Sequence, residues 1–174
     1  MPSPAPPPPP PPLSPSSLYI ALYLRNDPPT PNDFHWAIYH HLDSHHGGMK
    51  HHIRNEGSGW VPDHGPTVNI MKELLLVGLL RIAQVPESMG REGLERALRT
   101  FDGALNGGDM TCRVWVLKVL GVLRGEGLFG DVEGGVGLEA LEKEVKDWGN
   151  GHSMSASRNV QPRPVGESVL CLGK

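Results

Sequence analysis

Three short stretches in the first third of the chain have the alternating pattern of β-strands. Residues 18–24 (LYIALYL) and 34–40 (FHWAIYH) are rich in aromatic and branched side chains, and residues 50–55 (KHHIRN) form a third stretch. The segments between them contain the Pro, Gly, Asn and Asp residues that are typical of turns. The pattern therefore predicts three strands, of which the second and third form a hairpin.

Longer apolar patterns in the rest of the chain predict helices. The range 67–85 is apolar on nearly every side and begins at Thr67, which can cap a helix, so we expect a central, buried helix there. The ranges 91–101, 110–123 and 137–148 have the spacing of further helices. Strands followed by helices indicate the α+β class, here a small antiparallel sheet of three or more strands packed against about four helices.

Composition separates a folded domain from two tails. Ten of the 18 prolines lie in residues 1–15, and the seven consecutive prolines Pro6 to Pro12 favour polyproline II rather than a packed core. The polar range 149–174 is expected to be disordered as well. We therefore predict a disordered proline-rich tail at 1–16, one α+β globular domain at 17–148 and a disordered C-terminal tail at 149–174.

Charge and cysteine content narrow the expected partners. The net charge of −3 and the pI near 6.3 give no basic excess for nucleic acid, and the longest apolar run, Leu74 to Leu80, is too short to cross a membrane. Two cysteines do not form a disulfide framework, which favours a reducing, cytoplasmic location. The proline tract could be a ligand for an SH3 or WW domain, or simply a solvated tail. No cofactor is expected.

Cys112 is the candidate nucleophile. Asp109 or Thr111 can cap the helix that follows, which places Cys112 in its first turn, where the helix dipole favours a thiolate. The free N–H groups of that turn could hold an oxyanion. Cys112 also begins an apolar stripe with Val116 and Val119, so a buried structural cysteine fits the same pattern.

The histidines supply a candidate base. Eight of the nine lie between His35 and His64. His35 stands on a predicted strand, which suits a fixed base for a thiol, and His52 on the next strand could orient it, with His51 as the second choice. The remaining loop histidines surround a Gly-Gly turn with a single carboxylate, Asp43. Since zinc sites usually draw on ordered elements, we expect those histidines to be solvent-exposed and no resident metal.

The order of these residues resembles that of circularly permuted papain-like thiol enzymes, the lecithin retinol acyltransferase-like proteins among them. The motif HWAIY (His35 to Tyr39) is similar to the HWA-containing strand of that family, and TCRVWV (Thr111 to Val116) is similar to its cysteine helix. The resemblance covers about residues 18–123. It implies a papain-like fold with His35 as base, His52 as orienting residue and Cys112 as nucleophile. The whole domain also resembles a group of small fungal proteins of unassigned function.

Two functions are therefore compatible with the sequence. The first is a thiol-dependent hydrolase or acyltransferase, in which His35 deprotonates Cys112 and the thiolate attacks a carbonyl of a small-molecule or peptide substrate. The second is a non-catalytic binding or interaction module with a structural, buried cysteine. Contact between the thiol and the His35 ring would favour the first, and an enclosed apolar thiol would favour the second.

Overall fold

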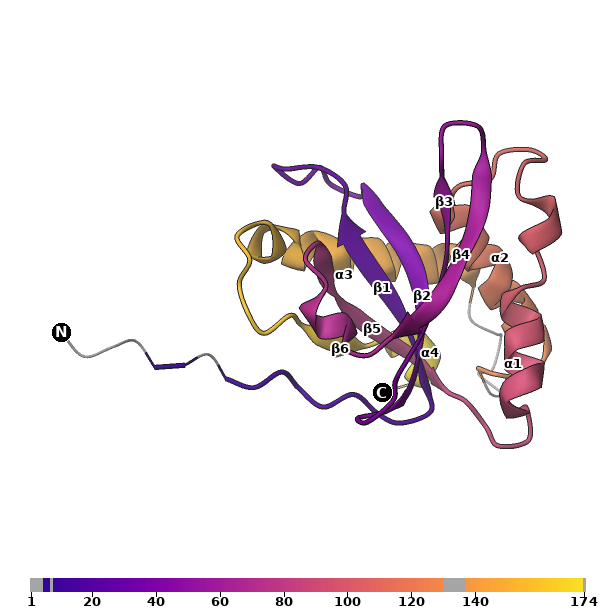
Figure 1. Cartoon of the computed structure of the whole chain (residues 1–174), viewed down its shortest axis with the longest axis horizontal. Helices are drawn as coiled ribbons and strands as arrows, with labels where there is room; N and C mark the ends of the chain where they lie inside the picture. The colour runs from indigo at the N-terminus through magenta and orange to yellow at the C-terminus, as the bar shows by residue number, and fades with distance from the viewer. Residues whose placement is uncertain (1–4, 7, 130–136, 174) are drawn as a thin grey trace.

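Six strands form one mixed sheet in the structure, a computed structural model that describes residues 5–6, 8–129 and 137–173 (Figure 1). Their order across the sheet is β4-β3-β2-β1-β5-β6, and every neighbouring pair is antiparallel except β5 and β6. The three predicted strands and the predicted hairpin are confirmed, but the sheet is larger and not purely antiparallel. The strands are β1 (Ser17–Leu24), β2 (Phe34–Asp43), β3 (Gly47–Asn55), β4 (Trp60–Thr67), β5 (Leu76–Gln84) and β6 (Val165–Glu167).

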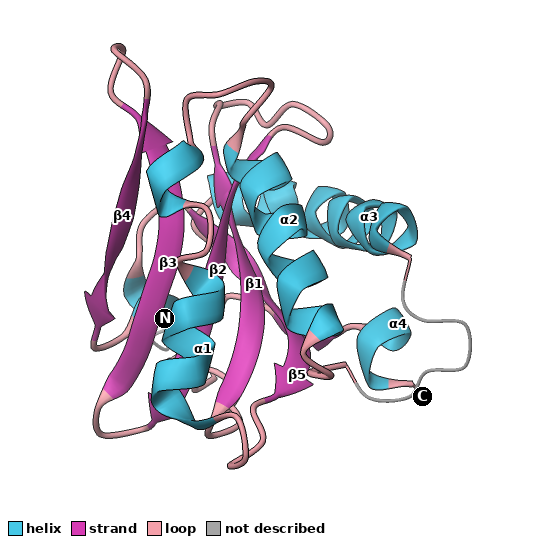
Figure 2. Ribbon diagram, turned by 90° about the vertical axis from the view of Figure 1, so that its right-hand side faces the viewer, coloured by secondary structure: helices cyan, strands magenta, loops and turns pink. Residues whose placement is uncertain are grey.

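The α-helices pack on one face of this sheet (Figure 2). They are α1 (Gly90–Leu98), α2 (Cys112–Gly125), α3 (Leu138–Ser157) and the short α4 (Val169–Leu172). Their apolar sides cover alternate residues of the central strands, such as Ile20 of β1 and Trp36 of β2. The α+β class and three of the predicted helices are thus confirmed. None of the described helices is long and apolar enough to cross a membrane.

The predicted helix at residues 67–85 is wrong. This range contains the end of β4, the 3₁₀ turn η1 (Ile70–Lys72) and strand β5. β5 lies between β1 and β6 and is buried on both faces, because Leu80 contacts the helix side while Leu79 contacts the opposite side. A strand that is buried on both faces reads as a nearly continuous apolar run, as a central helix does, so periodicity does not separate the two.

Residues 149–173 are folded in the structure, in contrast to the expected C-terminal tail. α3 continues to Ser157, β6 adds to the edge of the sheet beside β5, and α4 packs on the helix side. Arg163 is 1% exposed, and its guanidinium donates to the carbonyl oxygens of Leu74 and Val160. Backbone pairing and one buried cation thus hold a segment that has too few apolar residues to be recognised from composition.

The face opposite the helices, called here the open face, has a smaller apolar cluster. Tyr19 and Tyr23 of β1 and Tyr39 of β2 belong to it, and residues of η1 pack over it. Leu13, from the N-terminal segment, is half-buried against the same cluster.

The two edges of the sheet are irregular. β4 is one edge and contains Pro62 and Pro66, which pair in register with Ile53 and Met49 of β3. β6, the other edge, has three residues.

Candidate functional site

Cys112 and His35 lie on opposite sides of β2. Phe34 and Trp36 point to the helix side, where they belong to the same apolar cluster as Cys112. His35 stands between them in the strand, so its ring points to the open face, where it lies near Tyr23. The structure therefore does not bring the expected nucleophile and base together.

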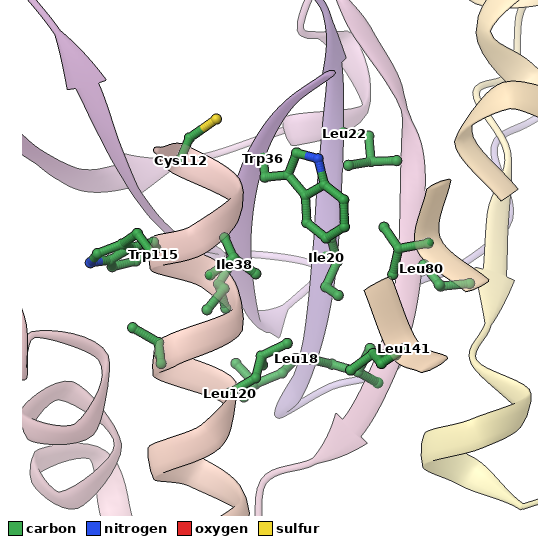
Figure 3. Close-up of a cluster of buried hydrophobic side chains, with 14 of the residues drawn as sticks. Leu18, Ile20, Leu22, Trp36, Ile38, Leu80, Cys112, Trp115, Leu120 and Leu141 are labelled. Carbon is green, nitrogen blue, oxygen red and sulfur yellow. The ribbon is translucent and has the colours of Figure 1, made fainter. Parts of the chain in front are cut away.

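Cys112 lies at the start of α2, at the margin of the buried helix-side cluster (Figure 3). Of the two expected caps, Thr111 is the one that caps this helix: its hydroxyl accepts from the N–H of Val114 at 3.2 Å. Cys112 is 6% exposed, and its polar contact is a long one, 4.0 Å from Sγ to the carbonyl oxygen of Phe34. This is the environment expected of a structural cysteine.

His35 and His52 do come together, on the open face. Nε2 of His35 lies 2.8 Å from Nδ1 of His52, and Nε2 of His52 lies 3.5 Å from Oδ2 of Asp63. Because a carboxylate only accepts, we place the proton of His52 on Nε2, which faces Asp63, so that Nδ1 of His52 accepts from His35. Oδ2 of Asp63 also pairs with Nε of Arg54 at 3.0 Å. Burial lowers the pKa of both histidines to about 4, so both rings are neutral at pH 7.

A second polar group adjoins the histidines. The carboxylate of Glu73 accepts from the hydroxyl of Tyr23 at 2.6 Å and from the ammonium of Lys50 at 2.8 Å, both at Oε2. The Lys50 ammonium also stands 5.3 Å from the centre of the Tyr23 ring. Burial and the bond to Glu73 raise the pKa of Tyr23, so its hydroxyl stays protonated and acts as a donor. The positive charge of Lys50 in turn favours the neutral form of His35.

These two groups border a cleft of about 320 Å³ between β3, β4 and η1. No hydrogen bond within the described part of the chain uses Oδ1 of Asp63, Oε1 of Glu73 or the hydroxyl of Thr67. The cleft thus combines one ammonium, two carboxylates with unused oxygens and a neutral imidazole. Its lining residues are Lys50, His52, Asp63, Gly65, Pro66, Thr67 and Glu73.

Comparison with known proteins places the chain that contains this cleft in a protein family. Residues 16–154 match a family of unknown function, DUF6914. The chain belongs to this family. No curated protein and no solved structure matches it. The DUF6914 match covers β1 to β5 and most of α3, so it includes every residue that lines the cleft. These comparisons show neither the expected papain-like resemblance nor a fungal origin.

His51, the second choice for orienting the base, faces the helix side instead. It is fully buried, and its Nε2 lies 3.4 Å from a carboxylate oxygen of Glu95 in α1. Next to it, His64 contacts Asp102 through Nε2 at 3.1 Å and stacks on Trp115 of α2. Nδ1 of His64 also accepts from the backbone N–H of His52. These contacts attach the β3–β4 hairpin to the helices of this DUF6914 member.

The histidine-rich turn has a local role. His46, exposed in the β2–β3 turn, contacts Asp43 through Nδ1 at 2.8 Å, and the backbone N–H groups of His45 and His46 donate to the same carboxylate. Among the described residues there is no group of three or more His, Cys, Asp or Glu side chains arranged to hold a metal ion.

Three residues of the two polar groups at this cleft, Tyr23, Glu73 and Asp63, are absent from the sequence-based candidates. Tyr23 faces His35 directly in the β1–β2 register, so strand alternation could have identified it. Glu73 was assigned to the middle of the incorrect helix, which removed it from consideration. Asp63 lies in β4, whose two prolines suppress any strand signal.

Proposed function

We propose that this DUF6914 chain is a non-catalytic binding module that takes a small polar molecule into the cleft of the open face. The proposal rests on one observation: two polar groups border the same cleft. They are Lys50–Glu73–Tyr23 and His35–His52–Asp63. Binding sites commonly combine a hollow with a few polar groups that converge on it.

The charges of the cleft indicate the chemistry of the ligand. Lys50 contributes one positive charge, Asp63 and Glu73 contribute two negative charges, and the His52 ring is neutral at pH 7. Asp63 is exposed and Glu73 is half-buried, so both carboxylates have oxygens that can accept from a ligand. A ligand with hydroxyl or ammonium groups supplies such donors, while the spare protons of Lys50 can reach an acceptor on the same ligand.

The thiol hydrolase or acyltransferase hypothesis has less support. A thiol nucleophile needs its base within hydrogen-bond reach, but Cys112 of α2 and His35 of β2 lie on opposite sides of the sheet. The enclosed thiol instead supports the alternative, in which Cys112 is part of the core. Both cysteines are unpaired in the structure, which supports the proposal of a reducing, cytoplasmic location.

A ligand panel tests the proposal on the full chain. Sugars, polyols and small amines are screened as three separate sets by ligand-observed NMR, and hits are measured by calorimetry. We expect one set to bind, and Glu73→Gln to weaken that binding by at least about tenfold, because a hydrogen bond to a charged group is lost. Asp63→Asn should weaken it as well.

Asp147→Asn is the matched control. Asp147 also pairs with a lysine, but it lies on the exposed side of α3, away from the cleft. Its replacement should leave the affinity unchanged. The proposal fails if no set binds, or if the hits bind Glu73→Gln and Asp63→Asn as tightly as the unmodified chain.

A further inference from the structure

In Figure 1 the indigo trace extends beyond the domain at one end and runs along the domain just before it enters β1. The N–H of Ser14 donates to the hydroxyl of Tyr19 at 2.8 Å, and the backbone of Ser16 bonds both to β2 and to the end of β5. Leu13 packs against the apolar cluster of the open face. These contacts fix the direction in which the preceding prolines run.

Two tyrosines form the floor beneath this segment. Tyr19 and Tyr39 are each 1% exposed, and their ring centres lie 6.3 Å apart with the planes tilted by 42°. Grooves lined by aromatic rings bind proline-rich segments, because polyproline II is already favoured in the free chain and little entropy is lost on docking. The segment that approaches these tyrosines is itself a run of prolines.

The prolines rest on the domain without being buried in it. Pro10, Pro11 and Pro12 border a hollow of about 220 Å³ together with Tyr39 and residues of η1. A second hollow, of about 360 Å³, lies between residues 8–10 and the segment around Met71. The described prolines remain exposed on their outer sides. Both hollows are open to solvent, and the proline segment buries little of its own surface, so the contact is suited to opening and closing.

We propose that Tyr19, Tyr39 and η1 form a docking groove for a polyproline II segment, and that residues 8–13 of the same chain occupy it. The occupied groove holds the proline tract against the domain and competes with an SH3 or WW domain for it. The apparent affinity of such a partner is its affinity for the free tract multiplied by the fraction of time that the tract is undocked. It is therefore about tenfold weaker when that fraction is about one tenth.

A spin label detects the docked segment in the full chain. Pro8→Cys introduces an exposed attachment point, whereas Cys112 and Cys171 are buried. We expect the label to accelerate the NMR relaxation of the backbone amides of residues 69–72, which lie beside the segment. Leu13→Glu, which places a charge in the apolar cluster, should abolish this effect. Leu74→Ser, at an exposed apolar residue outside the groove, should leave it unchanged.

A peptide added in solution tests the groove itself. A synthetic peptide of residues 5–15 should bind to the Leu13→Glu chain and shift the same amides, and should bind about tenfold more weakly to the unmodified chain, where the groove is filled. If Leu13→Glu does not fold, Tyr19→Phe replaces it, because this change removes the acceptor of Ser14 and keeps the ring. Equal relaxation in the unmodified and released chains, or no peptide binding to the released chain, overturns the proposal.

Discussion

His51 and His52 are neighbours in sequence, yet they serve opposite faces of β3. The His51 ring is fully buried on the helix side near Glu95, and the His52 ring borders the cleft of the open face beside His35. Burial lowers the pKa of each, to about 3 for His51 and about 4 for His52. One strand therefore carries two neutral imidazoles in two separate environments.

The stability of the fold should depend on these histidines at acidic pH. Their folded pKa values lie below the ordinary value of 6.5, so between pH 6.5 and about 4 the unfolded chain binds more protons than the folded chain. The free energy of unfolding therefore falls as the pH is lowered, by up to about 1.4 kcal/mol per pH unit for each such histidine. Urea unfolding at pH 7, 6, 5 and 4.5 measures this slope.

Two variants test whether His51 contributes to this pH dependence of stability. His51→Leu should flatten it, because one buried proton acceptor is gone, whereas His45→Gln, at an exposed turn position, should keep it. An unchanged slope in His51→Leu would show that His51 takes up its proton in the folded chain.

The two cysteines should both resist alkylation in the folded chain. Cys112 and Cys171 are each 6% exposed, and burial raises the pKa of the Cys171 thiol to about 11. Iodoacetamide at pH 6.5 should therefore label each of them only when the chain unfolds, as mass spectrometry of a denaturant series will reveal. Rapid labelling of native Cys112 that slows in His35→Ala would restore the thiol-enzyme hypothesis.

The bond between Tyr23 and Glu73 should be measurable as a contribution to stability. Tyr23→Phe removes a hydrogen bond to a charged carboxylate, which costs about 1.5–3 kcal/mol of unfolding free energy. Tyr39→Phe, which removes a bond to neutral His41, should cost closer to 1 kcal/mol. In a double-mutant cycle, Glu73→Gln should reduce the effect of Tyr23→Phe. Additive effects would mean that the two side chains do not interact.

Two leucines distinguish strand β5 from the helix that the sequence predicted. In a helix, Leu75 and Leu79 would share one face and be equally buried. In the structure Leu79 is fully buried, while Leu75 is 54% exposed. Leu79→Ala should therefore cost about 2–5 kcal/mol, and Leu75→Ala less than about 1 kcal/mol, by urea unfolding. Equal costs would contradict the assignment of the strand.

Removal of residues 159–174 should destabilise the domain, because it takes away β6, α4 and the buried Arg163. A loss of about 3 kcal/mol corresponds to a fall in Tm of about 6–12 °C for a chain of this length. Removal of residues 1–7, a proline-rich stretch, serves as the control and should leave Tm within about 1 °C of the full chain. If both deletions leave Tm unchanged, the C-terminal segment adds nothing to stability.

The sequence predicts well what depends on local alternation. Residues 34–40 show clearly which side chains share a face, and the structure agrees: Phe34 and Trp36 face the helices, and His35 faces away. The same alternation could have separated His35 from Cys112, had the helices been assigned to one side of the sheet. That assignment depends on the fold as a whole, which no single strand encodes.

The cleft depends on contacts distant in sequence and was therefore not predicted. Glu73 reaches Tyr23 and Lys50 only because η1 folds back over the open face, and these partners lie 50 and 23 residues away along the chain. Arg163 is a similar case, since a polar residue in a polar segment gives no local sign of its burial.

The irregular edges of the sheet restrict how this protein can aggregate or assemble. A proline has no backbone N–H to donate, so Pro62 and Pro66 interrupt the row of donors that β4 could offer to a strand from another molecule. At the other edge, β6 is only three residues long and offers few backbone groups for pairing with another strand. Neither edge is a good template for adding strands end to end, which protects the folded chain against fibril growth. Any protein partner is then expected to bind a face of the sheet rather than to extend it.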